Sequence, residues 1–141
     1  RLTTTPAELK ERFDLLMQVH DTMDKLNASL NHAIDARAAL QKAVTDKNAT
    51  GNASQRALAA LNGDIDRFVN LDIQSSEGAL VYPPRLRAWL SYISEALGEQ
   101  FVKPTPAMVQ VADQFVGEAN KAVASLDADV ANANTALGRK R

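Results

Sequence analysis

Apolar residues recur every three or four positions along two long stretches of the chain, which predicts two long amphipathic helices. The first stretch follows Thr5, Pro6, Ala7 and Glu8. Thr is suited to cap a helix, Pro to occupy its first position, and Glu to bond back to the cap. No Gly or Pro interrupts residues 7–47. At 1.5 Å per residue this helix is a rod of roughly 60 Å, so we expect an elongated bundle.

Two shorter helices are predicted next. Ser54 is suited to cap the first of them, and the apolar positions of this helix continue to near Gln74. A loop over residues 75–84 contains a double proline, which bars a helix before it and permits one after it. The next helix is expected over about residues 85–97, with Gly98 just beyond its end. Its inward positions are expected to be Leu86, Trp89, Leu90, Ile93 and Leu97.

Thr105 and Pro106 repeat the threonine–proline start and open the second long helix, whose apolar seam runs from Val109 to Leu137. The predicted organisation is a linker over residues 1–5, a single helical domain over 6–138, and a basic tail over 139–141. Because the chain begins at Arg1 with a threonine-rich stretch, we expect it to be one piece of a larger protein.

The packing of the four unequal helices has two solutions. The two short helices either form one broken antiparallel pillar beside the long ones, or form a hairpin within a four-helix up-down bundle. We favour the pillar because its summed length matches the first rod. It also places the alanine-rich stretches at one end and the bulky residues at the other, and small residues allow helices to approach closely. The predicted fold class is therefore an all-α elongated antiparallel bundle.

Composition excludes several classes of protein. Alanine is the most common residue and aromatics are 5% of the chain, which is typical of helical rather than β-sheet proteins. The formal net charge of −1 argues against nucleic-acid binding. The absence of Cys removes disulfides and thiolate metal sites. Mean hydropathy is −0.24, and no long apolar run suggests a membrane span.

Candidate catalytic and metal chemistry is sparse. His20 and Asp24 lie one helical turn apart, but a metal site needs three or four ligands with supporting partners, so we expect no metal and no cofactor. The carboxylates alternate with Lys and Arg along predicted helix faces, and no phosphate-binding glycine loop is present. We therefore expect no enzymatic activity from this chain.

The segment between the short helices is the candidate interaction site. Tyr82, Pro83, Pro84 and Arg85 form a turn that must direct the following helix into the bundle. Tyr82 offers an apolar ring and a hydroxyl for that role. Trp89 is expected to pack in the core, although with Tyr92 and Phe101 it could also form an aromatic platform for a ligand or partner.

The same segment carries a resemblance. Val81-Tyr82-Pro83-Pro84-Arg85-Leu86, then Leu90-Ser91-Tyr92-Ile93, then Pro104-Thr105-Pro106-Ala107, resemble the C-terminal helical region of bacterial BNR/Asp-box proteins. Those are sortilin-type β-propeller proteins, often labelled glycosyl hydrolases. The resemblance implies that any parent activity resides in the propeller, because no Asp-box motif occurs in this chain. It also implies export to the periplasm or outside the cell.

Two functions are consistent with these observations. The first is a non-catalytic accessory domain of a larger exported BNR/Asp-box protein, with the parent's β-propeller or another protein as its partner. The second is a stand-alone coiled-coil-like interaction protein or periplasmic helical binding domain. In either case we expect a monomer or a weak homodimer, without a nucleic-acid partner or a membrane span.

Overall fold

The structure, a computed structural model, describes residues 4–48, 51–72, 82–99 and 102–138. Within these residues the chain forms four helices and no strand: α1 (Pro6–Thr45), α2 (Asn52–Phe68), α3 (Leu86–Glu99) and α4 (Pro106–Ala136). The predicted all-α class is confirmed. α1 and α4 are the two long helices, with 40 and 31 residues.

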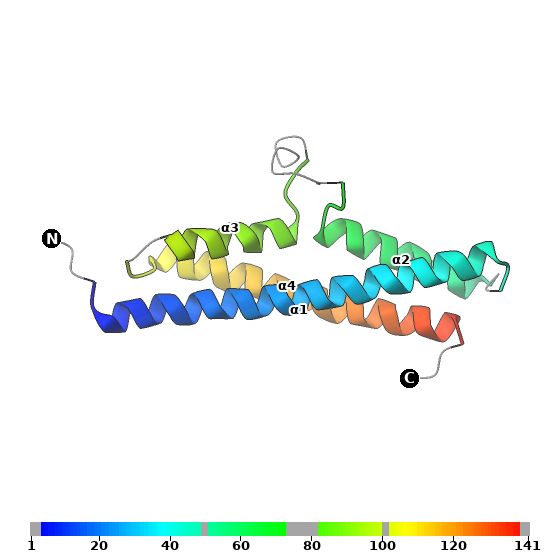
Figure 1. Cartoon of the computed structure of the whole chain (residues 1–141), viewed down its shortest axis with the longest axis horizontal. Coiled ribbons are helices and arrows are strands. Elements are labelled where there is room, and N and C mark those ends of the chain that lie inside the picture. The colour runs from blue at the N-terminus through cyan, green and yellow to red at the C-terminus, as the bar shows by residue number, and fades with distance from the viewer. Residues whose placement is uncertain (1–3, 49–50, 73–81, 100–101, 139–141) are drawn as a thin grey trace.

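The arrangement is the broken pillar (Figure 1). α1 and α4 run side by side in the same direction, while α2 and α3 follow one another end to end and run back along them. Every pair of helices touches, but α2 and α3 share the fewest contacts. The hairpin alternative, in which α2 and α3 would lie side by side, is not what the chain adopts. The two parts of the bundle are named below by their short helix, as the α2 half and the α3 half.

Both threonine–proline starts form as predicted. Thr5 caps α1 in a reciprocal capping box: its Oγ1 accepts from the Glu8 backbone N–H at 3.3 Å, and its own backbone N–H donates to Glu8 Oε2 at 2.9 Å. At α4, Thr105 Oγ1 accepts from the Met108 backbone N–H at 3.2 Å. Past the end of α4, Gly138 adopts a φ of 69°, a left-handed conformation that favours glycine.

The predicted bounds of α2 are wrong at both ends. Gly51 rather than Ser54 is the N-cap, and Ser54 is buried inside the helix at 4% exposure, where its small size suits a close helix contact. α2 ends at Phe68 instead of continuing to near Gln74, which lies outside the described residues. The chain turns there because the Asn70 side-chain Oδ1 accepts from the Asp72 backbone N–H at 2.9 Å, a local bond that competes with a helix.

α3 runs to Glu99, so Gly98 lies within the helix and not just beyond it. Another element satisfies the carbonyls at this end. Arg12 on α1 donates through Nη1 to the Leu97 carbonyl at 2.9 Å and to the Gly98 carbonyl at 3.3 Å. A cation at a helix C-terminus also interacts favourably with the helix dipole. Arg12 therefore joins the end of α3 to α1 without a glycine cap.

The cores of the two halves differ in side-chain size. In the α2 half, the buried side chains include alanines from three helices, which the sequence placed at this end, together with leucines, Ile65 and Phe68. In the α3 half, larger side chains do most of the filling. The buried residues of the α2 half include Ala33, Ala36, Leu40, Ala57, Leu61, Ala122, Leu126 and Ala133, and those of the α3 half include Leu15, Val19, Leu86, Leu90, Leu97 and Val116.

Candidate functional site

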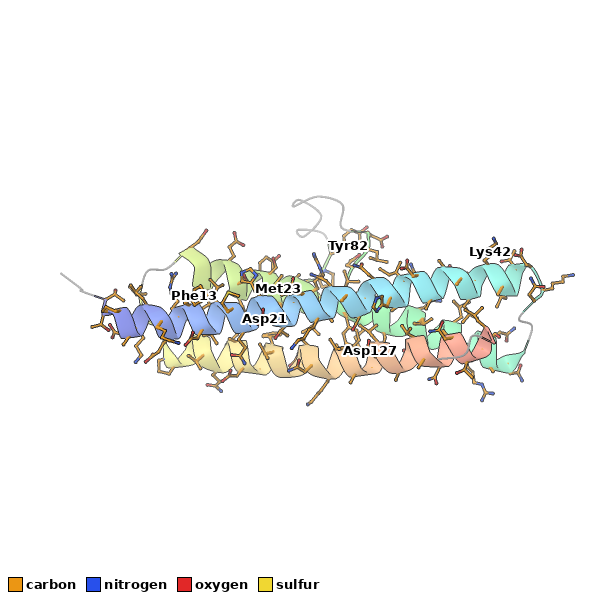
Figure 2. All side chains as sticks on the ribbon, turned by 60° about the horizontal axis from the view of Figure 1, so that its bottom comes forward. Phe13, Asp21, Met23, Lys42, Tyr82 and Asp127 are labelled. Carbon is orange, nitrogen blue, oxygen red and sulfur yellow. The ribbon has the colours of Figure 1, made fainter. Side chains whose placement is uncertain are left out.

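Exposed large apolar side chains gather in the α3 half. Among the described residues, Leu71, just after α2, is the exception. Figure 2 shows Phe13 toward the α3 end of α1, and Tyr82 near the middle of the bundle, beside the gap between α2 and α3. The exposed set in this half is Leu9, Phe13, Met17, Tyr82, Trp89, Tyr92, Val102, Val109 and Val111. Apolar surface concentrated in this way is typical of interaction sites.

Trp89 does not pack in the core, which corrects the expectation from the sequence. It is 43% exposed, whereas its neighbour Leu90 is fully buried. Consecutive helical residues point about 100° apart, and the buried stripe of α3 follows Leu86, Leu90 and Leu97. The Trp89 ring lies at the edge of that stripe and stacks on Phe115 of α4, with centroids 5.8 Å apart and planes 25° apart. Tyr92 meets Trp89 edge-on, also at 5.8 Å.

These rings form one end of an open groove between α3 and α4, about 340 Å³ in volume. The residues along the groove are almost entirely apolar, and neither a carboxylate nor an amine nor an imidazole lines it. The lining residues are Trp89, Tyr92, Ile93, Ala96 and Leu97 from α3, and Ala107, Met108, Val111 and Phe115 from α4. We call this surface the α3–α4 groove.

The corresponding surface in the α2 half is different. The hollow between α2 and α4 is lined by small or polar side chains and lacks a large apolar one. Its lining residues are Ala53, Arg56, Ala57, Ala60, Asn132, Thr135 and Ala136. Its exposed lining is also largely apolar, but it is formed by alanine methyl groups and the aliphatic parts of polar side chains, and not by rings or long aliphatic side chains. Among the described residues, the two hollows therefore differ in aromatic content, and large side chains suited to anchor a partner line the α3–α4 groove.

A larger hollow of about 770 Å³ lies between the N-terminal parts of α1 and α4, and it is more polar. Two of its acidic residues form ion pairs: Glu11 Oε2 lies 3.2 Å from Lys103 Nζ, and Asp14 Oδ2 lies 2.6 Å from Lys10 Nζ. These pairs are exposed and contribute little to stability. The hollow is lined by charges of both signs, three carboxylates and Lys103, together with apolar residues. Because three of these charged groups form exposed ion pairs, we take the α3–α4 groove as the better-defined binding surface.

The predicted Tyr82–Arg85 segment lies beside the site and not in it. Tyr82 is 40% exposed, and Pro83 and Pro84 precede the first turn of α3. Arg85 stands at the start of that turn, since its carbonyl accepts from the Trp89 backbone N–H at 3.1 Å. None of these four residues lines the α3–α4 groove. Phe101, the third member of the considered aromatic platform, lies outside the described residues.

His20 is part of the α1–α3 contact. Its Nε2 lies 3.1 Å from the Ser94 hydroxyl oxygen. About two turns further along α1, Asn27 Oδ1 accepts a hydrogen bond from Arg87 Nε on α3 at 2.8 Å. Within the described residues, no group of three or more His, Cys, Asp or Glu side chains is placed to hold a metal ion. These polar contacts fix α3 against α1 on the side away from the groove.

A pair of carboxylates marks the α2–α4 contact. Burial raises the pKa of Asp129, and the neighbouring Asp64 carboxylate, which also shares a hydrogen bond with it, raises it further. Ser125 on α4 donates a hydrogen bond to Asp64. The Asp64 carboxylate therefore disfavours the charged form of Asp129.

At the start of α1, hydrogen bonds from the Thr5 backbone and side chain lower the pKa of Glu8.

Sequence reasoning missed Met108, Val111 and Phe115 as site residues. The available signal was the width of the apolar arc on α3: Trp89, Tyr92 and Ala96 form a second stripe beside the buried leucines. A single core contact needs only one stripe. The contact between Trp89 and Phe115 joins residues far apart in the sequence, and their spacing carries no information about it.

No protein-family model, curated protein or solved structure matches this chain. None of the helices in the described part of the chain combines the length and the hydropathy that crossing a bilayer requires.

Proposed function

We propose that this chain is a non-catalytic helical interaction domain that holds another protein, or another domain of the same polypeptide, through the α3–α4 groove. One observation carries the proposal: an apolar groove with exposed aromatic rings occupies the α3 half, while the matching hollow of the α2 half is lined by alanines and polar side chains and has no aromatic ring. Exposed Trp and Tyr side chains are enriched at protein interfaces because they bury large areas at low entropic cost.

The chemistry of the groove supports binding rather than catalysis. General acid–base or nucleophilic catalysis requires titratable groups held against the substrate. The groove lining offers aromatic and aliphatic side chains, with the Tyr92 phenol as its one ionisable group. On α1, the His20 imidazole and the Asp14 carboxylate make their contacts elsewhere on the bundle. The proposed role is therefore to position a partner.

The resemblance in the Tyr82–Ala107 region suggests a more specific form of this proposal. It would make the chain an accessory domain of an exported bacterial BNR/Asp-box protein, with the β-propeller of that protein as the partner. An elongated bundle with one apolar end is suited to such a role, because it can contact a second domain at that end and project away from it.

Site-specific photo-crosslinking in the full-length protein tests the proposal. A photoreactive phenylalanine analogue replaces Tyr92 in the groove, and a matched control replaces Ala60, which is exposed on α2. We expect crosslinks from position 92 to one defined segment of a partner or domain, identified by mass spectrometry, and none from position 60. A segment within a propeller would favour the more specific proposal. No crosslink at position 92, or equal and scattered crosslinks at both positions, would reject the interaction role.

A further inference from the structure

The shape of the α3–α4 groove selects the kind of segment that it can bind. Its lining on α3 extends from Trp89 to Leu97, which is about 12 Å of helix at 1.5 Å per residue. Both walls are helices, and the floor is apolar throughout. A helix lying in such a groove buries side chains spaced by three and four residues from one face. Three turns of a partner helix are enough to fill it.

The charges beside the groove select the chemistry of that helix. Three exposed glutamates are helical neighbours of the lining residues: Glu95 lies three residues after Tyr92, Glu99 three after Ala96, and Glu118 three after Phe115. Residues three apart on a helix are adjacent on its surface. Arg85, one turn before Trp89, is a basic residue at the Trp89–Phe115 end of the groove, the end at which Glu118 also lies. The groove thus has a predominantly acidic rim.

We infer that the α3–α4 groove binds an amphipathic helix whose apolar stripe is flanked by Lys or Arg residues. The inference rests on the proposed function and specifies the partner. Apolar side chains of the helix fill the groove between Trp89 and Ala107, and its basic residues face the three glutamates. Complementary charge at a rim increases the association rate and discriminates between partners more than it adds affinity.

A second copy of this chain fits the groove less well. A two-fold dimer through the groove would place the same surface on both sides. Three of the four charged residues named at the rim, Glu95, Glu99 and Glu118, are acidic, so most of the rim charges of the two copies would have the same sign. Like charges brought together at an interface disfavour association.

Fluorescence of Trp89 provides the test, because it is the single Trp of the chain and lines the groove. Two helical peptides of 14 residues without Trp are titrated into the full chain. Both carry the same leucine stripe, flanked by Lys in one and by Glu in the other. We expect the Lys peptide to shift Trp89 emission to the blue and to bind about tenfold more tightly at low salt, with a smaller difference at high salt.

Two variants locate the binding. Tyr92→Asn with Val111→Asn changes two exposed groove residues and should abolish binding of the Lys peptide. Ala53→Asn with Ala60→Asn, the matched pair in the hollow of the α2 half, should leave it unchanged. A third variant, with Glu95, Glu99 and Glu118 all changed to Lys, should reverse the preference between the peptides. Thermal melts of each variant show that the bundle is still folded.

Several results would overturn the inference. Equal binding of both peptides, or unchanged preference in the triple-Lys variant, would reject the basic partner helix. A blue shift that grows with protein concentration alone would identify a second copy as the occupant. Binding of neither peptide, combined with a defined crosslink from position 92, would reject the partner helix and leave the interaction domain intact. Failure of both experiments would reject both proposals.

Discussion

The two halves of this bundle share α1 and α4 but solve the packing problem differently. In the α2 half, small residues such as Ala33, Ala57 and Ala133 are buried between the helices, and the hollow beside them has no aromatic ring. In the α3 half, the aromatic side chains Trp89 and Tyr92 are 43% exposed. The proposed function assigns binding to the α3 half, and we predict that substitutions in the α2 half have the larger effects on stability.

The largest expected effect comes from removing a leucine in the α2 half. Leu126 is fully buried, so Leu126→Ala should lower the free energy of unfolding by about 2–5 kcal/mol through lost burial and the cavity left behind. Val111→Ala in the groove, where the side chain is 43% exposed, should cost under about 1 kcal/mol. Urea denaturation measures both. Equal losses would show that the groove is packed as tightly as the α2 half.

Arg12→Ala should weaken the attachment of α3 selectively. The guanidinium donates to two carbonyls at the end of α3, and hydrogen bonds to charged groups contribute roughly 1.5–3 kcal/mol. We expect increased amide hydrogen exchange in α3 with little change in α2. Uniformly faster exchange along the whole chain would show that the halves unfold as one unit and do not differ in local stability.

Enlarging a side chain, instead of shortening one, should also distinguish the two halves. Ala33 is fully buried between helices of the α2 half, so Ala33→Leu should cost about 1–3 kcal/mol through overpacking. Ala96 is exposed along the groove, and Ala96→Leu should be close to neutral in stability. Thermal melts of the two variants, which carry the same chemical change, provide the comparison. A neutral Ala33→Leu would contradict tight packing in the α2 half.

The smallest effect is expected at the carboxylate pair between α2 and α4. Because the pKa of Asp129 is raised in the folded state, its stabilising contribution is present below the pKa of an unfolded Asp and is lost as the pH rises through the folded value. Asp129→Asn should therefore stabilise the chain at pH 7 by roughly 0.2–0.5 kcal/mol, similar to relief of other like-charge pairs. The gain should disappear in acid. A variant less stable than the parent at pH 7 would contradict the proposed repulsion.

The pKa shift of Glu8 is opposite in direction to that of Asp129, so the two groups can be compared within one pH titration. Hydrogen bonds from Thr5 lower its pKa in the folded state. Its contribution is present above the pKa of an unfolded Glu and is lost as the pH falls through the folded value. Acid should therefore weaken the start of α1 while it relieves the Asp64–Asp129 contact.

The sequence predicted those features that depend on local chemistry. The starts of α1 and α4 follow from Thr5 and Thr105, each followed by a proline, and the length of the first rod led to the broken pillar. The end of α2 was missed because the Asn70–Asp72 side-chain bond competes locally with the helix, and the apolar pattern does not register such a bond.

The site was harder to predict because it depends on contacts between distant parts of the chain. The apolar arc of α3 is wide enough to include both Leu90 and Trp89, and only the packing of α3 against α1 and α4 decides that Leu90 is buried. Phe115 stacks on Trp89 across that interface. Tyr82 belongs to a distinctive turn in the sequence, but it lies outside the groove that the packing of α3 on α4 creates.

We propose that the α3–α4 groove is open in the free chain and is covered by a partner. Acrylamide quenching of Trp89 fluorescence measures this exposure, since Trp89 is the only Trp and lies in the groove. We predict efficient quenching in the free chain and strong protection when the Lys-flanked peptide is added. A Trp89 already shielded from acrylamide in the free chain, or one equally quenched at saturating peptide, would contradict the account.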